Sequence, residues 1–143
     1  MGEALAGGCL LAWLIALSGY DIRRRRLPNH LTLPGAVVIM VCAASTGRGV
    51  PALVGAAALF SVYAVVHLAA PSAMGAGDVK LAIGVGALTG AAGSEAWILA
   101  ALAAPLLTAG WAVVALVFRG RRTVPHGPAM CLAAGVAVGL VVV

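Results

Sequence analysis

The sequence predicts an all-α membrane protein with six transmembrane helices. Of its 143 residues, 63% are hydrophobic and only 9% are charged, whereas soluble domains carry about 25% charged residues. A chain of this size with so few polar residues cannot cover a water-facing surface. Six apolar runs, separated by short polar connections, fit a single polytopic domain over residues 1–143.

Each run is close to the length of a short or tilted membrane helix and ends at polar, glycine or proline residues. The first run precedes four arginines, whereas a signal peptide carries its charges before its apolar core, so we expect an uncleaved helix. Polar loops are expected at 21–29 and 119–128, and Pro105 lies inside the fifth run. The expected helices are 4–20, 31–45, 52–70, 79–92, 96–118 and 129–143.

The basic residues predict the orientation of these helices. Nine Lys and Arg residues stand against four Asp and Glu residues, and six crossings place all but Arg48 on one side. By the positive-inside rule that side is cytoplasmic, and both termini are outside. We therefore interpret the positive charge as an orientation signal and expect no nucleic-acid partner. The residues on the cytoplasmic side are 23–26, Lys80, Arg119, Arg121 and Arg122.

Two acids occupy matching places in this topology, because Asp21 closes the first helix and Asp78 opens the fourth. A carboxylate at the centre of a membrane helix costs roughly 2.5 to 3.5 kcal/mol, so such residues are usually functional or paired. Two facing carboxylates can share one proton, with one activating a water and the other donating to a carbonyl, as in aspartic proteases. The helix amino terminus at Asp78 and the neighbouring Arg23 at Asp21 both favour the anion, so the member that keeps the proton stays open.

Gly75 and Gly77 precede Asp78 and permit close backbone approach and unusual dihedral angles. Three other interpretations of the acids remain. Each acid could cap a helix or pair with an arginine and serve topology alone. A small proton- or cation-coupled transporter subunit would place the acids near mid-membrane, lining a path open to both faces. An inert scaffold would not need an acid flanked by glycines.

The remaining polar residues suggest no cofactor. His30, His67 and His126 have no metal-ligand spacing, and His67 could either pack through a hydrogen bond or touch the acids. Gly84 and Gly86 indicate close helix packing rather than phosphate binding. The cysteines lie inside apolar runs without a CxxC motif, at Cys9, Cys42 and Cys131.

Three segments resemble the type 4 prepilin peptidases, a family of membrane aspartic proteases. Residues 75–81 match the family's GxGDxKL motif, and Asp21 followed by Leu27-Pro28-Asn29 looks like its first-aspartate segment. Residues 125–129 are similar to its late Pro-Phe-Gly-Pro element, with His126 in place of the aromatic residue. The three segments appear in the expected order and cover nearly the whole chain.

The resemblance implies cleavage of the short basic leader of prepilins or pilin-like proteins at the cytoplasmic membrane, with Asp21 and Asp78 as the catalytic pair. The expected partners are therefore prepilin-like substrates, together with the lipid bilayer that the composition indicates. No cofactor is expected, and the oligomeric state stays open. No CxxC domain precedes Asp21, which implies the short form without methyltransferase activity. Lys80 would either tune Asp78 or reach phospholipid headgroups. The residues expected to bind substrate or support the site are Gly75, Gly77, Lys80, Pro28, Asn29, Pro125, Gly127 and Pro128.

Overall fold

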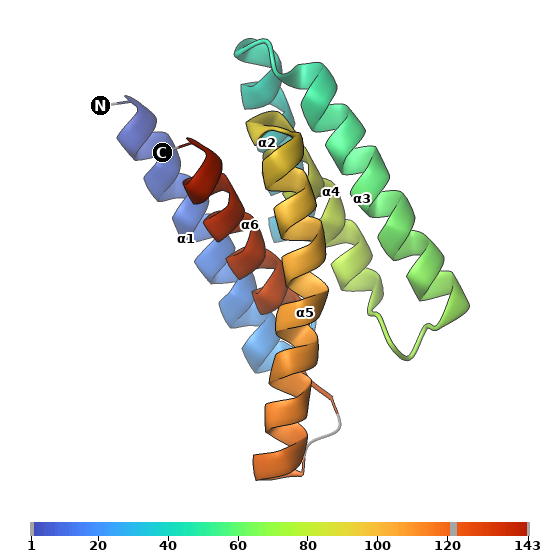
Figure 1. The fold of residues 1–143 in the computed structure, drawn as a ribbon. Helices are drawn as coiled ribbons and strands as arrows, with labels where there is room; N and C mark the ends of the chain where they lie inside the picture. Colours follow the sequence, from blue (N-terminus) through green and yellow to red (C-terminus); the bar gives the residue numbers. More distant parts are fainter. Residues whose placement is uncertain (1, 121–122, 143) are drawn as a thin grey trace.

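The computed structural model describes residues 2–120 and 123–142, which form a bundle of α-helices (Figure 1). The all-α class predicted from the sequence is confirmed. Two of the basic residues used to orient the chain, Arg121 and Arg122, lie outside the described residues. The helices are α1 (Gly2–Arg24), α2 (Asn29–Ser45), α3 (Gly49–Ala69), α4 (Ala76–Ala92), α5 (Ser94–Arg119) and α6 (Gly127–Val142).

Helix α4 lies at the centre of the bundle. It contacts α2, α3, α5 and α6, whereas α1 packs on α6 and α2. Its buried residues run along nearly its whole length, from Val79 to Gly90. Because α4 is enclosed by other helices, the segment that carries Asp78 is held from several directions.

The outer helices are suited to lipid. Three of them are long and apolar enough to cross a membrane, at Leu5–Arg24, Gly49–Ala69 and Ser94–Arg119, and α2 and α6 are shorter apolar helices. Their outer faces expose large side chains such as Ile15, Leu68 and Leu106, which water-facing surfaces rarely do over large areas. Together these faces indicate a membrane protein.

Two predicted loop boundaries were wrong. Helix α1 continues through Arg24, so Asp21 is helical. The next residue, Arg25, has a φ of 49°, and its N–H donates to the Asp21 carbonyl at 2.8 Å. Basic residues in the last turn stabilise the helix carboxyl terminus. Helix α6 begins at Gly127, which places Pro128 in its first turn, where proline needs no N–H partner.

Helices α3 and α4 approach each other closely through glycines. A Cβ atom built on Gly86 would collide with the backbone of Gly55, and one built on Gly55 would collide with the Gly86 carbonyl. The Trp97 indole N–H donates to the Gly55 carbonyl at 3.0 Å beside this contact. The prediction that glycines of the fourth helix serve close packing is confirmed.

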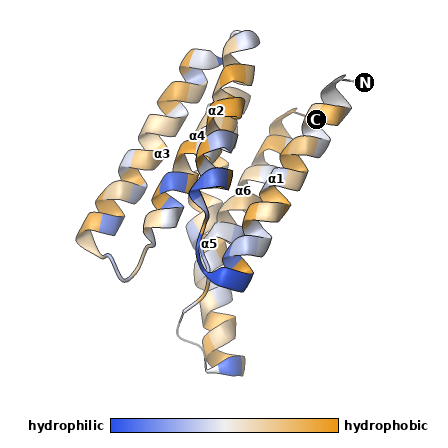
Figure 2. Cartoon of the chain, turned by 180° about the vertical axis from the view of Figure 1, so that it is seen from behind, coloured by the Kyte–Doolittle hydropathy of each residue, from blue (hydrophilic) through white to orange (hydrophobic). Residues whose placement is uncertain are grey.

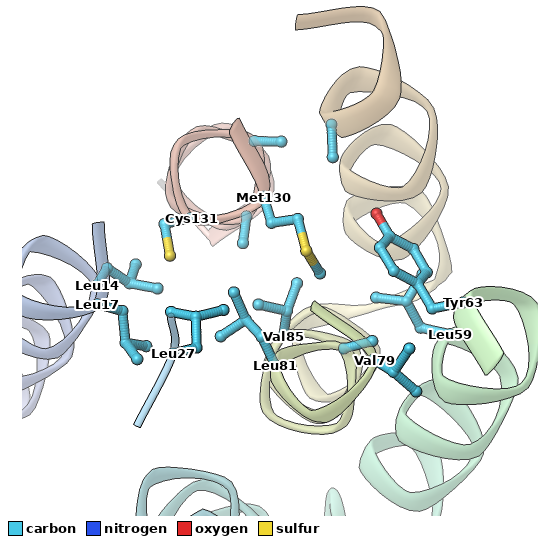
Figure 3. Packing of buried hydrophobic residues seen from close by; sticks show 14 residues of the cluster. Leu14, Leu17, Leu27, Leu59, Tyr63, Val79, Leu81, Val85, Met130 and Cys131 are labelled. Atoms are coloured by element: carbon cyan, nitrogen blue, oxygen red, sulfur yellow. The ribbon is translucent and has the colours of Figure 1, made fainter. Parts of the chain in front are cut away.

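A packed apolar layer joins α1, α3, α4 and α6 (Figure 3). Leu17 and Leu81 are fully buried in this layer. Leu17 stands four residues before Asp21 and Leu81 three residues after Asp78, so each acid continues the face of its helix that points into the core. The side chains that surround the two leucines include Leu14, Leu27, Val85, Met130 and Cys131.

We predict that Gly86→Ala lowers the free energy of unfolding by about 1 to 3 kcal/mol, because its Cβ would meet backbone atoms that cannot turn aside. Thermal unfolding in detergent measures the effect. Gly139→Ala is the matched control, since a Cβ there meets nothing within 4 Å. Equal melting temperatures for the two variants would contradict the close α3–α4 contact.

Candidate active site

The structure brings Asp21 and Asp78 to one cavity of about 270 Å³. The cavity lies at the end of the bundle where α1 ends and α4 begins, and the two carboxylates are close enough for their charges to interact. The first-aspartate segment and the glycine-rich segment, far apart in sequence, therefore share one site. The lining residues are Asp21, Arg25, Arg26, Leu27, Gly75, Ala76, Gly77, Asp78 and Lys80.

Asp21 is only 6% exposed, and its carboxylate is held by the first turn of α6. The Gly127 N–H donates to Asp21 Oδ2 at 2.9 Å. A helix amino terminus favours a negative charge, so α6 presents a suitable partner to this carboxylate. A Cβ on Gly127 would lie 2.6 Å from Oδ2, so a side chain at this position would displace the Asp21 carboxylate from its present place.

Asp78 lies in the first turn of α4, as expected from the sequence. Gly77 packs closely on Leu27, since a Cβ there would lie 3.2 Å from Leu27 Cβ, tighter than an ordinary contact. Gly75 has φ −72° and ψ 148°, an extended conformation open to other residues, and a Cβ there would only touch Asp78 Oδ2 at 3.4 Å. The expectation of unusual dihedral angles at these glycines was wrong, and close approach is seen at Gly77 but not at Gly75.

Lys80, which lines the cavity, links α4 to the start of α2. Its Nζ donates to Asn29 Oδ1 at 2.9 Å, which ties the first residue of α2 to the first turns of α4. Pro28 precedes this residue as the N-cap of α2, with an extended backbone. Asn29 thus contacts the site through Lys80, whereas Pro28 shapes the entry into α2.

The arginines at the cavity are not the one expected from the sequence. Arg25 and Arg26 line the cavity and Arg23 does not. The Arg25 guanidinium donates to Thr123 Oγ1 at 2.8 Å and to the Thr123 carbonyl at 3.3 Å. A positive φ is uncommon outside glycine; at Arg25 it turns the chain so that one side chain joins the cavity to the α5–α6 connection.

Two histidines lie near the site but not in the cavity lining. His67 Nδ1 bonds the Met74 carbonyl at 2.7 Å, so His67 packs against the connection that leads to Gly75 and does not line the cavity. His126 bonds Tyr63 and Thr108. Sequence reasoning missed Tyr63 and Thr108, because a single tyrosine or threonine in an apolar helix belongs to no motif.

The predicted site residues separate into three groups. Asp21, Gly75, Gly77, Asp78 and Lys80 line the cavity, and Gly127 and Asn29 hydrogen-bond to lining residues. The three prolines do not line it: Pro28 and Pro128 lie at helix starts, and Pro125 lines a neighbouring cavity of about 500 Å³ beside Arg25. Within residues 2–120 and 123–142, no group of three or more His, Cys, Asp or Glu side chains could hold a metal ion.

Comparison with known proteins gives one family. The family model of the type IV leader peptidase family matches residues 8–143, which include both cavity aspartates and Gly127. No curated protein and no solved structure gives a significant match. Since the family match spans nearly the whole chain, the protein belongs to the type IV leader peptidase family.

Proposed function

We propose that this protein is an aspartic endopeptidase that removes the leader peptide of type IV prepilins or pilin-like proteins. The observation that carries the proposal is the meeting of Asp21 and Asp78 in one cavity of a chain that belongs to a leader peptidase family. No observation favours transport: both acids lie in terminal turns of their helices, whereas a transporter would place them near mid-membrane.

The chemistry follows from two neighbouring carboxylates in a partly enclosed cavity. Both cannot readily ionise together, so the pair keeps one proton, which belongs to the dyad rather than to one residue. The ionised carboxylate accepts a proton from a water, the water oxygen attacks the scissile carbonyl carbon, and the protonated carboxyl donates to the carbonyl oxygen. Collapse of the tetrahedral intermediate breaks the C–N bond: one of its hydroxyl groups returns a proton to the ionised carboxylate, and the amine leaves with the proton of the other carboxyl, which restores the dyad with one proton.

The cations on the cavity rim support this role by compensating the acids. Arg25, Arg26 and Lys80 line the cavity together with the two carboxylates. Opposite charges lower the cost of keeping a carboxylate at a membrane boundary. These three cations would repel a basic leader. We therefore propose that they compensate the charge of the acids and hold the loops, and that they do not bind the substrate.

We further propose that all six helices cross the cytoplasmic membrane with the site at the cytoplasmic face and both termini outside. Hydrophilic segments gather at the end of the bundle where α1 ends and α2 and α4 begin (Figure 2). At the other end Arg48 donates to the Ala91 carbonyl at 3.2 Å, in the last turn of α4. A helix-capping role accounts for this one arginine on the outer side.

We predict that Asp21→Asn and Asp78→Asn each lower leader cleavage by at least about 100-fold, because each removes one partner of acid–base catalysis. The chain is co-expressed with a candidate prepilin, and the mass of the pilin is measured. Arg48→Gln removes a charge at the far end and serves as the control with normal cleavage. Cleavage near the normal rate in either aspartate variant would contradict the proposed pair, and an intact leader with the unmodified chain would favour a transporter.

We predict that Gly127→Ala lowers cleavage by about 10- to 100-fold, because its methyl group would displace the Asp21 carboxylate. Gly135→Ala in the same helix is the control, since its Cβ would meet only Leu14 Cδ1 at 3.6 Å, an ordinary contact. Cleavage rates and melting temperatures of both purified variants distinguish a displaced carboxylate from an unfolded bundle. Normal cleavage by Gly127→Ala would count against the catalytic role of Asp21 in this geometry.

We predict that alkaline phosphatase fused after Val142 is active and that fusions after Arg26 or Gly120 are inactive, because this enzyme folds only outside the cytoplasmic membrane. Green fluorescent protein at the same positions should give the opposite pattern. Fluorescence from the fusion after Val142 would overturn the proposed orientation.

A further inference from the structure

His126 is bonded at both ring nitrogens by side chains from two other helices. Nε2 lies 2.8 Å from the Tyr63 hydroxyl of α3, and Nδ1 bonds the Thr108 hydroxyl of α5. Figure 3 shows the Tyr63 side chain with its hydroxyl directed away from the α3 backbone. His126 itself stands immediately before α6, so one imidazole joins three helices.

The directions of these hydrogen bonds follow from the number of available protons. The Thr108 hydroxyl donates its only proton to the Ala104 carbonyl at 2.9 Å, so it accepts from the Nδ1–H of His126. Nε2 is then unprotonated and accepts from the Tyr63 O–H. Burial lowers the pKa of His126 below its usual value near 6.5, which agrees with a neutral ring.

The backbone around His126 is connected to Asp21 through the next residue, Gly127. The His126 carbonyl accepts from the Met130 N–H at 3.1 Å as the first bond of α6, and the next residue, Gly127, donates to Asp21 Oδ2. Pro125 and Pro128 flank this pair, and a proline ring restricts φ to a narrow range. The direction of the Gly127 N–H therefore depends on where the His126 ring is anchored.

We propose that His126 is a positioning residue for Asp21. Tyr63 and Thr108 hold its ring, the ring sets the first turn of α6, and that turn aims the Gly127 N–H at the Asp21 carboxylate. This role deepens the proposed peptidase function and rests on it. It also gives α3 and α5, neither of which contributes a lining residue to the cavity, a direct connection to a catalytic carboxylate.

The test removes the two anchors and leaves the ring in place. Tyr63→Phe combined with Thr108→Val deletes both hydroxyl groups at nearly constant volume. Ser61→Ala combined with Thr46→Val is the matched control, because it removes hydroxyl groups from exposed positions. His126→Gln keeps an amide that can replace one anchor bond, and His126→Phe keeps an aromatic ring with no nitrogen.

The first measurement is hydrogen exchange of residues 125–128 in the full-length protein in detergent. Pro125 and Pro128 carry no amide hydrogen, so only His126 and Gly127 report. We expect at least about tenfold faster exchange of the Gly127 amide in the anchor variant, Tyr63→Phe with Thr108→Val, than in the control. The reason is that the Gly127 N–H would lose its hydrogen bond to the Asp21 carboxylate, and a bond to a charged acceptor is stronger than one to a neutral acceptor. Unchanged exchange with a normal melting temperature would overturn the proposal, whatever the protein cleaves.

The second measurement separates kcat from KM for leader cleavage. Misplacing a catalytic carboxylate should lower kcat by about 10- to 100-fold with little change in KM. His126→Gln should recover part of kcat, whereas His126→Phe should not. Normal kcat in the anchor variant, or equal rates for Gln and Phe, would overturn the positioning role.

The two measurements distinguish a failure of the positioning role from a failure of the proposed peptidase function. If the unmodified chain cleaves no leader, the proposed function is wrong, and the exchange measurement still decides whether His126 positions the Gly127 N–H. If the anchor variant does not fold, the single change Tyr63→Phe is measured in the same way, with Ser61→Ala as its control.

Discussion

The hydrogen bond from the Gly127 N–H to Asp21 Oδ2 joins the first helix of the chain to the last. A buried carboxylate without partners is strongly unfavourable, and Asp21 is only 6% exposed. The 2.9 Å bond supplies a partner from a helix amino terminus, where a negative charge is favoured. Because a Cβ at residue 127 would collide with this carboxylate, the identity of one residue in α6 affects the position of another in α1.

The site also requires that α4 bring Asp78 to the cavity that Asp21 lines. Lipid tails are as apolar as leucine, so membrane helices associate through close packing and small residues rather than through the hydrophobic effect. Gly55 and Gly86 provide such a contact between α3 and α4, and Gly77 allows the start of α4 to meet Leu27. The helix with the most glycine-dependent contacts is therefore the one enclosed by the others.

Single polar side chains hold the connections at the cavity end of the bundle. Lys80 bonds Asn29, Arg25 bonds Thr123, and His67 bonds the Met74 carbonyl. Each bond joins a loop or a helix start to a neighbouring segment, whereas the bodies of the helices are held mainly by apolar packing. With the His126 contacts to Tyr63 and Thr108, these bonds give the site a polar frame that the membrane-facing surfaces lack.

The sequence by itself determined the all-helical class, the approximate helix ranges, the two acids and the family resemblance. Apolar run length, helix-ending residues and the spacing around Asp78 are local properties, so they can be read without coordinates. The helix ends were predicted less accurately than the helices themselves, because whether Asp21 or Gly127 is helical depends on the hydrogen bonds of the adjacent turn.

Only the tertiary structure decided which residues meet. It placed Arg25 rather than Arg23 at the cavity, assigned close approach rather than unusual dihedral angles to Gly77, and connected Tyr63 and Thr108 to His126. These contacts join residues from different helices, and their partners are set by how the helices rotate and cross. No local pattern records that rotation, because it results from the packing of all the helices at once.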